Sequence, residues 1–291
     1  MRWAEIAIRA PHDAEEAVTA ALLDVGCSGV AAEVTNPVAA DPLEVRGWLP
    51  VLDGVQGKLA ALTSALGDLP AHGLPSIADV VVRHVADVDW LHEWRKHHHP
   101  RRIGRRLLIA PPWEATESET ERSVVLIDPG MAFGTGSHPT TRLCLELLDR
   151  VVRPGDEVVD VGAGSGILGI AALRLGASAV WASEIDSLPR TVAVQNARAN
   201  GVEARLTVLD PDSLEAACPR CRIVVCNIIA ETIVALAPML GRLVLPHGLV
   251  VVSGIVAERL PQVTEALHRS GLTPIELLSE DVWRAVLATA G

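Results

Sequence analysis

The alternation of apolar and polar positions predicts a small α+β domain in the first 86 residues. Strands carry apolar residues at every second position, whereas helices repeat them every three or four positions and often end on glycine. On these criteria the elements are, in order, a strand at 3–9, a helix at 13–26, strands at 28–34 and 43–50, a helix at 55–67 and a strand at 77–87. This order is typical of a ferredoxin-like sandwich. Nothing in the segment indicates catalysis.

A different pattern begins at residue 106. Two strand-like runs lead into a glycine-rich loop, after which apolar strands alternate with helices. The predicted strands of this part lie at 156–162, 178–184, 203–210, 221–227, 248–254, 272–280 and 282–290, and the helices include 167–177, 189–201 and 228–244. Such alternation predicts an α/β fold with a doubly wound parallel sheet. Because no helix separates the last two strands, we expect them to be antiparallel neighbours.

Residues 87–105 form a candidate linker helix and hinge. Trp90 and Trp94 share one helical face, and Pro100 would end the helix. We therefore place the two domains at 1–86 and 106–291.

Two groups of residues have the side chains of metal ligands. The consecutive histidines at 97–99 would project in different directions around a helix rather than converge on one ion. Cys218 and Cys221 form one CxxC pair, but the second pair that a zinc finger needs is missing. We therefore expect no metal site.

The net charge of −11 argues against a protein that binds nucleic acid. The arginines at 101, 102, 105 and 106 could contact a phosphate backbone, but we interpret them as a solvated basic collar. The sequence has no signal-peptide pattern, no apolar run of membrane-spanning length and no disulfide framework. We expect a monomeric cytoplasmic protein that contacts neither nucleic acid nor membrane.

The loop DPGMAFGTGSHPTT, residues 128–141, combines three glycines with two prolines, His138 and the only phenylalanine of the chain. Such a loop could cradle a phosphate, bind a metal through His138 or simply form a turn. No lysine follows the glycines, and no other metal ligand lies near His138 in sequence, which disfavours the first two roles. We interpret the loop as a flexible lid that bends at Gly134 and Gly136.

An apolar strand runs directly into Gly162, Gly164 and Gly166, and a helix begins after them. Glycines at the carboxyl end of a parallel strand let a ligand approach the main chain closely. Glu184 lies about 20 residues beyond Gly162, at the end of the next predicted strand, where a carboxylate can accept both hydrogen bonds of a ribose diol. These residues predict a cofactor that contains adenosine.

Two cofactor types fit the glycines. Counted from Gly164, GSGILG matches the GxGxxG of dinucleotide-binding domains, so a nicotinamide-dependent oxidoreductase is the alternative. Counted from the strand end at Val161, the motif is GxGxG, with Ile167 where a dinucleotide motif needs glycine. S-adenosylmethionine has no pyrophosphate to bind and suits this second register better. No GKS or GKT follows, which excludes a P-loop.

Asn227 ends the predicted strand 221–227 among apolar neighbours, so its polar side chain is conspicuous. Amine methyltransferases hold an Asn or Asp near this place in the sequence order, and its oxygen can accept a hydrogen bond from the incoming amine. The other interpretation is a buried structural asparagine.

These motifs resemble those of the bacterial ribosomal protein L-eleven methyltransferase family, which consists of class I S-adenosylmethionine-dependent methyltransferases. The resemblance is carried by EWRKHHHP, IGRRLLIAPPW, DPGMAFGTGSHPTTRLCLELL, DVGAGSGILGIAALRLGA, VVCNIIA and VVVSGI. Residues 1–85 match mainly in predicted topology. The resemblance implies a Rossmann-like, seven-stranded sheet with an antiparallel last strand, preceded by a small domain that captures the ribosomal protein.

The resemblance also implies the site residues. Those expected to contact S-adenosylmethionine are Thr141, Gly162, Gly164, Glu184 and Asn227, and those of the loop that closes over its methionine end are Phe133, Gly134, Gly136 and His138. The implied substrates are lysine side chains and the α-amine of ribosomal protein L-eleven, with another protein lysine as the alternative. The sequence departs from the usual family residues at His98 (Phe), Ala163 (Cys) and Glu184 (Asp).

The expected reaction is an in-line displacement, in which a neutral amine attacks the sulfonium methyl group and S-adenosylhomocysteine leaves. Neutralising a free lysine at pH 7.4 costs about 4 kcal/mol, because its pKa is near 10.4. An apolar pocket lowers that pKa, so no strong base is required. Asn227 would orient the amine. His138 could accept the proton or only stabilise the loop through a hydrogen bond.

Overall fold

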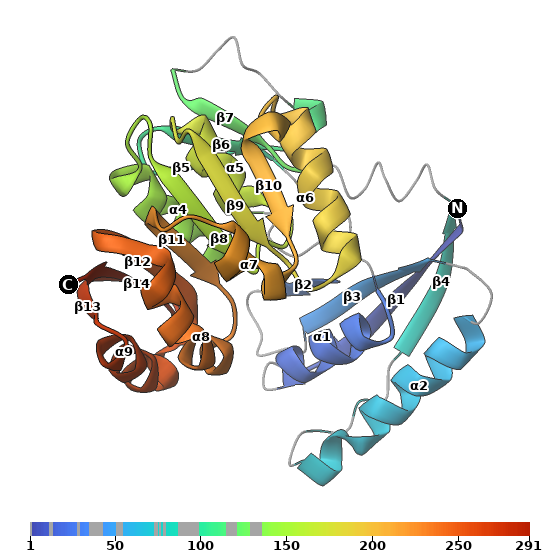
Figure 1. Ribbon diagram of the computed structural model, residues 1–291. Helices are drawn as coiled ribbons and strands as arrows, with labels where there is room; N and C mark the ends of the chain where they lie inside the picture. Colours follow the sequence, from blue (N-terminus) through green and yellow to red (C-terminus); the bar gives the residue numbers. More distant parts are fainter. Residues whose placement is uncertain are drawn as a thin grey trace. The chain divides into compact units, whose positions relative to one another are not determined.

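The computed structural model divides the chain into two compact units, Met1–His97 and His98–Gly291 (Figure 1). The structure describes residues 2–11, 14–27, 30–34, 43–50, 55–72, 75, 77, 80–86, 99–114, 121–128 and 136–291. The predicted linker helix, with Trp90, Trp94 and the first two of the three consecutive histidines, lies outside the described residues.

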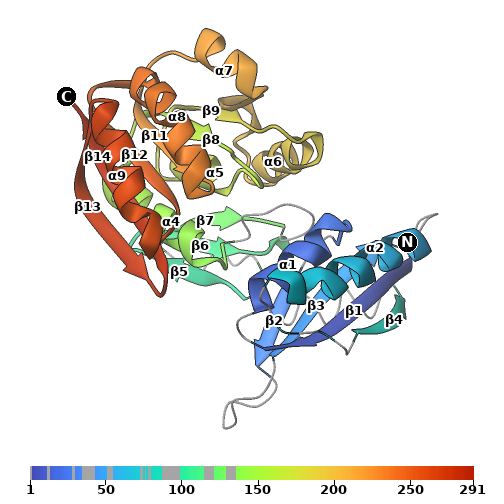
Figure 2. The same ribbon diagram turned by 90° about the horizontal axis from the view of Figure 1, so that it is seen from below.

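The first unit contains a four-stranded antiparallel sheet in the order β2-β3-β1-β4. Its elements are β1 (Arg2–Ala10), α1 (Glu15–Asp24), β2 (Val30–Val34), β3 (Leu43–Pro50), α2 (Val55–Asp68), the 3-10 helix η2 (Leu69–His72) and β4 (Val80–Ala86). The helices α1 and α2 lie side by side over the sheet (Figure 2). The predicted ferredoxin-like order of strands and helices is therefore confirmed.

Alternation along β1 explains the core of this unit. Ala4, Ile6, Ile8 and Ala10 are fully buried, whereas Arg9 between them is exposed. The buried side chains meet apolar residues of the two helices and of β3, namely Val18, Leu22, Leu43, Val45, Leu49, Leu62 and Leu66. A strand with one apolar face and a helix with one apolar stripe can both be buried only against each other.

The second unit contains a seven-stranded sheet in the order β10-β9-β8-β11-β12-β14-β13. The strands are β8 (Glu157–Val161), β9 (Ala179–Ser183), β10 (Leu206–Leu209), β11 (Cys221–Asn227), β12 (Val244–Val256), β13 (Leu272–Glu280) and β14 (Trp283–Ala290). The five strands β10, β9, β8, β11 and β12 are parallel, whereas β14 is antiparallel to both β12 and β13. The predicted antiparallel last strand is thus confirmed.

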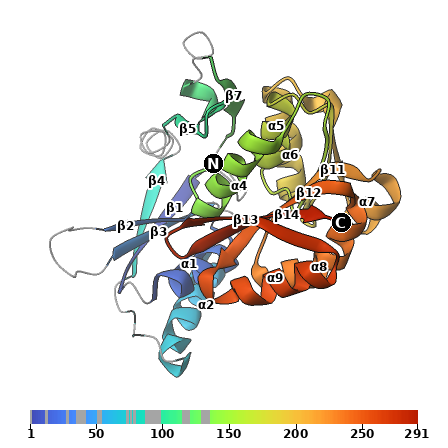
Figure 3. The same cartoon turned by 90° about the vertical axis from the view of Figure 1, so that its left-hand side faces the viewer.

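Helices cover both faces of this sheet (Figure 3). They are α4 (Pro139–Val151), α5 (Ile167–Arg174) and α6 (Ser187–Ala199) on one face, and α7 (Pro211–Ala217), α8 (Ala230–Leu243) and α9 (Leu260–Arg269) on the other. Successive residues of a strand therefore enter different cores: Val158 joins the first and Val159 the second. Burial on both faces explains why these strands read as continuous apolar runs.

Besides the short 3-10 helices, one strand and two α-helices of the described residues were not predicted. The strand β5 (Arg101–Ile103) pairs with β6 (Leu107–Ala110), which pairs in turn with β7 (Ser123–Leu126). The helices α4 and α7 were also missed. Each begins with a proline that follows a side-chain cap, His138 for α4 and Asp210 for α7. The loop prediction that extended to Thr141 is therefore wrong at its end, because Pro139 is pre-organised for the first helical turn.

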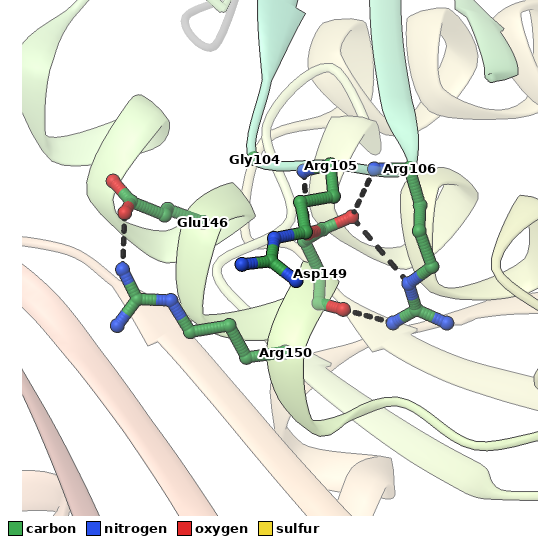
Figure 4. Close-up of a pocket in the computed structure, with 6 residues that line it drawn as sticks. All are labelled: Gly104, Arg105, Arg106, Glu146, Asp149 and Arg150. Atoms are coloured by element: carbon green, nitrogen blue, oxygen red, sulfur yellow. Dashed lines mark hydrogen bonds and ion pairs between the residues drawn. The ribbon is translucent and has the colours of Figure 1, made fainter.

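Arg105 and Arg106, from the arginine-rich segment, form the turn between β5 and β6 and bind Asp149 there. The buried carboxylate of Asp149 accepts hydrogen bonds from the main-chain N–H groups of Arg105 and Arg106, at 2.9 Å each. The Arg106 side chain donates to the carbonyls of Asp149 and Val152, and the turn borders a cavity of about 540 Å³ (Figure 4). A Cβ on Gly104 would lie 2.6 Å from the Asp149 carboxyl carbon, so this turn requires glycine.

Candidate active site

The glycine turn lies at the carboxyl edge of the sheet, where β8 ends beside β9. The N–H groups of Gly162 and Ala163 each donate to the carbonyl of Ser183, at 2.9 Å. Gly162, Gly164 and Gly166 have φ values of 75°, 54° and 80°, which side chains rarely tolerate. A Cβ on Gly162 would lie 2.6 Å from Ile228 Cγ2. The main chain is therefore kept bare where a ligand would approach it.

The register of the motif follows from the ends of the elements. Strand β8 ends at Val161, and α5 begins at Ile167 with Gly166 as its N-cap. The glycine that starts the turn is thus Gly162, and Ile167 already belongs to the helix. This arrangement is GxGxG, whereas the GSGILG reading starts three residues after the strand end.

Glu184 lies next to the glycine turn, as its spacing predicted. Its Oε2 accepts a hydrogen bond from the Gly164 N–H at 2.9 Å, and its Oε1 accepts one from the Ile185 N–H at 2.8 Å. The carboxylate is half-buried. A charged acceptor is therefore fixed at the edge of the bare main chain.

Asn227 and Thr141 meet at the end of β11, although 86 residues separate them in sequence. The Asn227 Nδ2 donates to the Thr141 Oγ1 at 3.3 Å. Thr141 is fully buried in the first turn of α4, whereas Asn227 is half-buried. Within the part of the chain that the structure describes, nothing donates to the Asn227 amide oxygen, so it can accept a hydrogen bond from a ligand.

The loop 128–141 is described only in part. Phe133 and Gly134 lie outside the described residues. Gly136 is buried with φ at 83°, and a Cβ there would lie 3.1 Å from Ile109 Cγ2 and 3.2 Å from Ile167 Cδ1. The end of the loop therefore packs against the first residue of α5, directly after the glycine turn.

His138 caps α4. Its Nδ1 accepts the Thr140 N–H at 3.3 Å and lies 2.7 Å from the Thr140 Oγ1. Its ring packs edge-on against Trp283, with centroids 5.0 Å apart. Burial lowers the pKa of His138 below 6.5, and the positive charge of Arg142 lowers it further, against the opposing effect of Glu280. The imidazole is thus neutral at pH 7 and hydrogen-bonded within the helix cap.

The β13–β14 hairpin contributes to the same region. Arg142 Nε donates to Glu280 Oε2 at 3.2 Å, across 138 residues of sequence. The guanidinium also donates to Glu280 Oε1 and to the carbonyl of Ser137. The first turn of α4 is therefore attached to the hairpin. The sequence analysis did not foresee this contact, because no local pattern relates an arginine to a glutamate so far along the chain.

Asp160 is a second residue that the sequence analysis missed. It is fully buried in β8, and its Oδ2 accepts the Gly169 N–H in the first turn of α5 at 2.9 Å. The N-cap of α5, Gly166, has no side chain that could do this. Among the described residues, the other oxygen, Oδ1, is buried and has no hydrogen-bond partner. Burial raises the pKa of Asp160 to about 7, the Gly169 N–H opposes this, and the charge of Glu184 adds to it. In the sequence, Asp160 could have been noticed as an acidic residue within the apolar run VVDV.

Of the two metal candidates, the structure describes His99 and the pair Cys218 and Cys221. His99 Nδ1 lies 3.5 Å from Glu114 Oε1. The thiols of Cys218 and Cys221 both donate to the carbonyl of Pro219. Among the described residues, no three His, Cys, Asp or Glu side chains come together as metal ligands. No helix in the described ranges is long and apolar enough to cross a membrane.

Comparison with known proteins identifies relatives that extend over the whole chain. The sequence model of the family "Ribosomal protein L11 methyltransferase (PrmA)" matches residues 2–290. The ribosomal protein L11 methyltransferases of Pelotomaculum thermopropionicum and Bacillus cytotoxicus are 40% and 36% identical, and each alignment covers 99% of both chains. The crystal structure of a ribosomal protein L11 methylase from Lactobacillus delbrueckii subsp. bulgaricus superimposes with a TM-score of 0.60 at 31% identity, covering 67% of this chain and 98% of that one. The resemblance seen in the motifs is confirmed: this chain belongs to the ribosomal protein L11 methyltransferase family.

Proposed function

We propose that this chain transfers methyl groups from S-adenosylmethionine to lysine side-chain and N-terminal amines of ribosomal protein L11. The observation that carries the proposal is the bare glycine turn beside the Glu184 carboxylate, with the Asn227–Thr141 pair at the end of the adjacent strand β11. Family membership supports the substrate. Because this substrate is a ribosomal protein, we place the reaction in the cytoplasm.

The residues present fit S-adenosylmethionine. Gly162 and Gly164 leave the main chain accessible, and Glu184 offers carboxylate oxygens to the ribose diol. We place the methionine end of the cofactor near Thr141 and Asn227. The loop that closes over this end contains Phe133, Gly134, Gly136 and His138. When bound, the cofactor supplies an electrophilic methyl group on a positively charged sulfur.

The transfer step then depends on a neutral, oriented amine. The Asn227 amide oxygen can accept an N–H of the amine and direct its lone pair toward the methyl group. A lysine amine loses its proton more easily in a desolvated position, because burial disfavours the charged form. Holding the amine in line contributes several kcal/mol more. His138 already accepts a hydrogen bond at Nδ1 within the helix cap, which favours a structural role over proton transfer.

We assign substrate capture to the first domain, residues 1–86, and hinge motion to 87–105. The first unit has its own hydrophobic core and none of the site residues, which supports a binding role. If so, residues 87–291 alone should bind S-adenosylmethionine with unchanged affinity but methylate L11 poorly. Equal activity of the truncated and the complete chain would contradict a capture role.

The direct test is methyl transfer to purified L11. Radiolabelled S-adenosylmethionine and the complete enzyme should label L11, and mass spectrometry should place the methyl groups on lysine side chains and the α-amine. Labelling of a different ribosomal protein instead of L11 would redirect the proposal to another protein lysine. Tight binding of NADH without methyl transfer would favour the oxidoreductase alternative.

A further inference from the structure

Several main-chain groups of the turn that carries Glu184 form hydrogen bonds with side chains. The Glu184 carboxylate accepts N–H groups from Gly164, Ile185 and Asp186, the last at 3.2 Å. The carbonyls of the same turn are held by one side chain from α6: Arg190 Nε donates to the Glu184 carbonyl at 2.6 Å, and Arg190 Nη2 donates to the Ile185 carbonyl at 3.1 Å.

Arg190 also reaches the next strand of the sheet. Its Nη2 lies 2.7 Å from Asp210 Oδ2, directly after β10, and Asp210 is itself the N-cap of α7. The Arg190 side chain is 31% exposed and that of Asp210 51% exposed. The hydrogen bond from Arg190 lowers the pKa of Asp210, so the pair is ionised at neutral pH. One guanidinium thus ties the loops after β9 and β10 together.

A planar guanidinium is needed for this arrangement. It presents donors in a fixed fork, whereas lysine has a single ammonium at the end of a flexible stem. Lysine at position 190 could keep the attraction to Asp210, but it could not donate to two carbonyls and a carboxylate in the same geometry.

We propose that Arg190 is a positioning residue for recognition of the cofactor's ribose, acting through Glu184; this inference rests on the proposed function. A carboxylate has about four acceptor positions, and main-chain N–H groups occupy three of them here. The ribose diol must use the remaining position and displace one N–H group. Its binding therefore depends on how the turn is held, and Arg190 holds it from the carbonyl side.

The test is calorimetric titration of S-adenosylhomocysteine into the wild type and Arg190→Lys. We expect Arg190→Lys to weaken binding about tenfold, the size expected for lost charge-assisted hydrogen bonds. Arg198→Lys is the matched control, because Arg198 lies on the same helix and pairs with Glu203 through the same two guanidinium atoms, Nε and Nη2. The control should bind like the wild type.

A second ligand separates positioning from general loss of structure. The 2′,3′-dideoxy analogue of S-adenosylhomocysteine lacks the diol, so the wild type and Arg190→Lys should bind it equally. The rate of methyl transfer at saturating S-adenosylmethionine should change less than twofold in Arg190→Lys. Asp210→Asn, which removes the charge that anchors Arg190, should show a smaller loss with the same dependence on the diol.

The outcomes distinguish this inference from the proposed function. A wild type that does not bind S-adenosylhomocysteine would overturn the function and the inference with it. If the wild type binds but Arg190→Lys matches Arg198→Lys, the inference alone is overturned. An equal loss of affinity for the dideoxy analogue would likewise overturn it, because the effect would then be unrelated to the ribose.

Discussion

The two halves of the proposed site are built differently. In the adenosine half, the Gly164 N–H of the glycine turn donates to Glu184, which lies 20 residues along the chain, directly after the neighbouring strand β9. In the transfer half, side chains from distant segments meet: Thr141 with Asn227 across 86 residues, and Arg142 with Glu280 across 138. We infer that substitutions in the first half act mainly on cofactor binding, and those in the second mainly on methyl transfer.

The largest effect is expected in the adenosine half, from Gly162→Arg. A Cβ at this position would clash with Ile228. The arginine would also have to adopt φ of 75°, which residues other than glycine rarely do. Binding of S-adenosylmethionine should be abolished, as measured by calorimetry. Gly201→Arg is the control, because Gly201 has φ of 66° with no atom near its missing Cβ, and it should still bind the cofactor. Unchanged affinity of Gly162→Arg would break the assignment of this half.

Asp160 stabilises the first turn of α5, the helix that follows the glycine turn of the adenosine half. Asp160→Ala leaves the buried Gly169 N–H without an acceptor, so the free energy of unfolding should fall by about 1–3 kcal/mol in chemical denaturation. Asp160→Asn can keep an oxygen toward that N–H and should cost less. If the Asp160→Ala and Asp160→Asn variants are equally stable, the hydrogen bond from the Gly169 N–H does not explain why Asp160 is buried.

The same residue gives a dependence on pH with a defined sign. The folded pKa of Asp160 is raised from 3.8 to about 7. The folded state therefore binds this proton more tightly than the unfolded state does. The resulting contribution to the free energy of unfolding is fully present below pH 3.8 and is lost as the pH rises through 7. Relative to Asp160→Asn, the wild type should lose stability between pH 4 and pH 7. A difference that stays constant over this range would contradict the raised pKa.

In the transfer half, Thr141→Val removes a buried hydroxyl at nearly constant volume. Without its partner, the Asn227 amide is less well fixed, and the rate of methyl transfer at saturating cofactor should fall about tenfold. Thr191→Val, which removes an exposed hydroxyl on α6, should keep the full rate. A Thr141→Val enzyme that transfers methyl groups normally would show that this contact does not position Asn227.

The smallest effect is expected at His138. Asparagine is also a good N-cap, so His138→Asn should retain methyl transfer, whereas His138→Ala should lose about 1 kcal/mol of stability. Because the folded pKa is below 6.5, the wild type should lose stability as the pH falls below 6.5, and His138→Asn should lack this loss. A large loss of methyl transfer in His138→Asn, with a changed pH–rate profile, would instead indicate proton transfer.

The difference between the halves also explains what the sequence could predict. Gly162, Gly164 and Glu184 were recognisable because consecutive parallel strands place their carboxyl ends together at a fixed spacing. The doubly wound parallel sheet followed from the alternation of strands and helices, and the antiparallel pairing of the last two strands followed from the absence of a helix between them. The pairing of Thr141 with Asn227 emerged only with the fold, since a helix before β8 and the end of β11 have no sequence relationship. The same holds for Arg190, whose role depends on the carbonyl directions of one turn.

The most direct test of the account compares Glu184→Ala with Asn227→Ala in single-turnover methyl transfer to L11, over a range of S-adenosylmethionine concentrations. Glu184→Ala should raise the concentration of cofactor needed for half-maximal rate, while the saturating rate stays near that of the wild type. Asn227→Ala should lower the saturating rate about 10²-fold, since misplaced reactants cost about this much, and weaken cofactor binding far less. If both variants lose only cofactor affinity and reach the wild-type rate at saturation, Asn227 does not act in the transfer step and the division of the site into two halves is wrong.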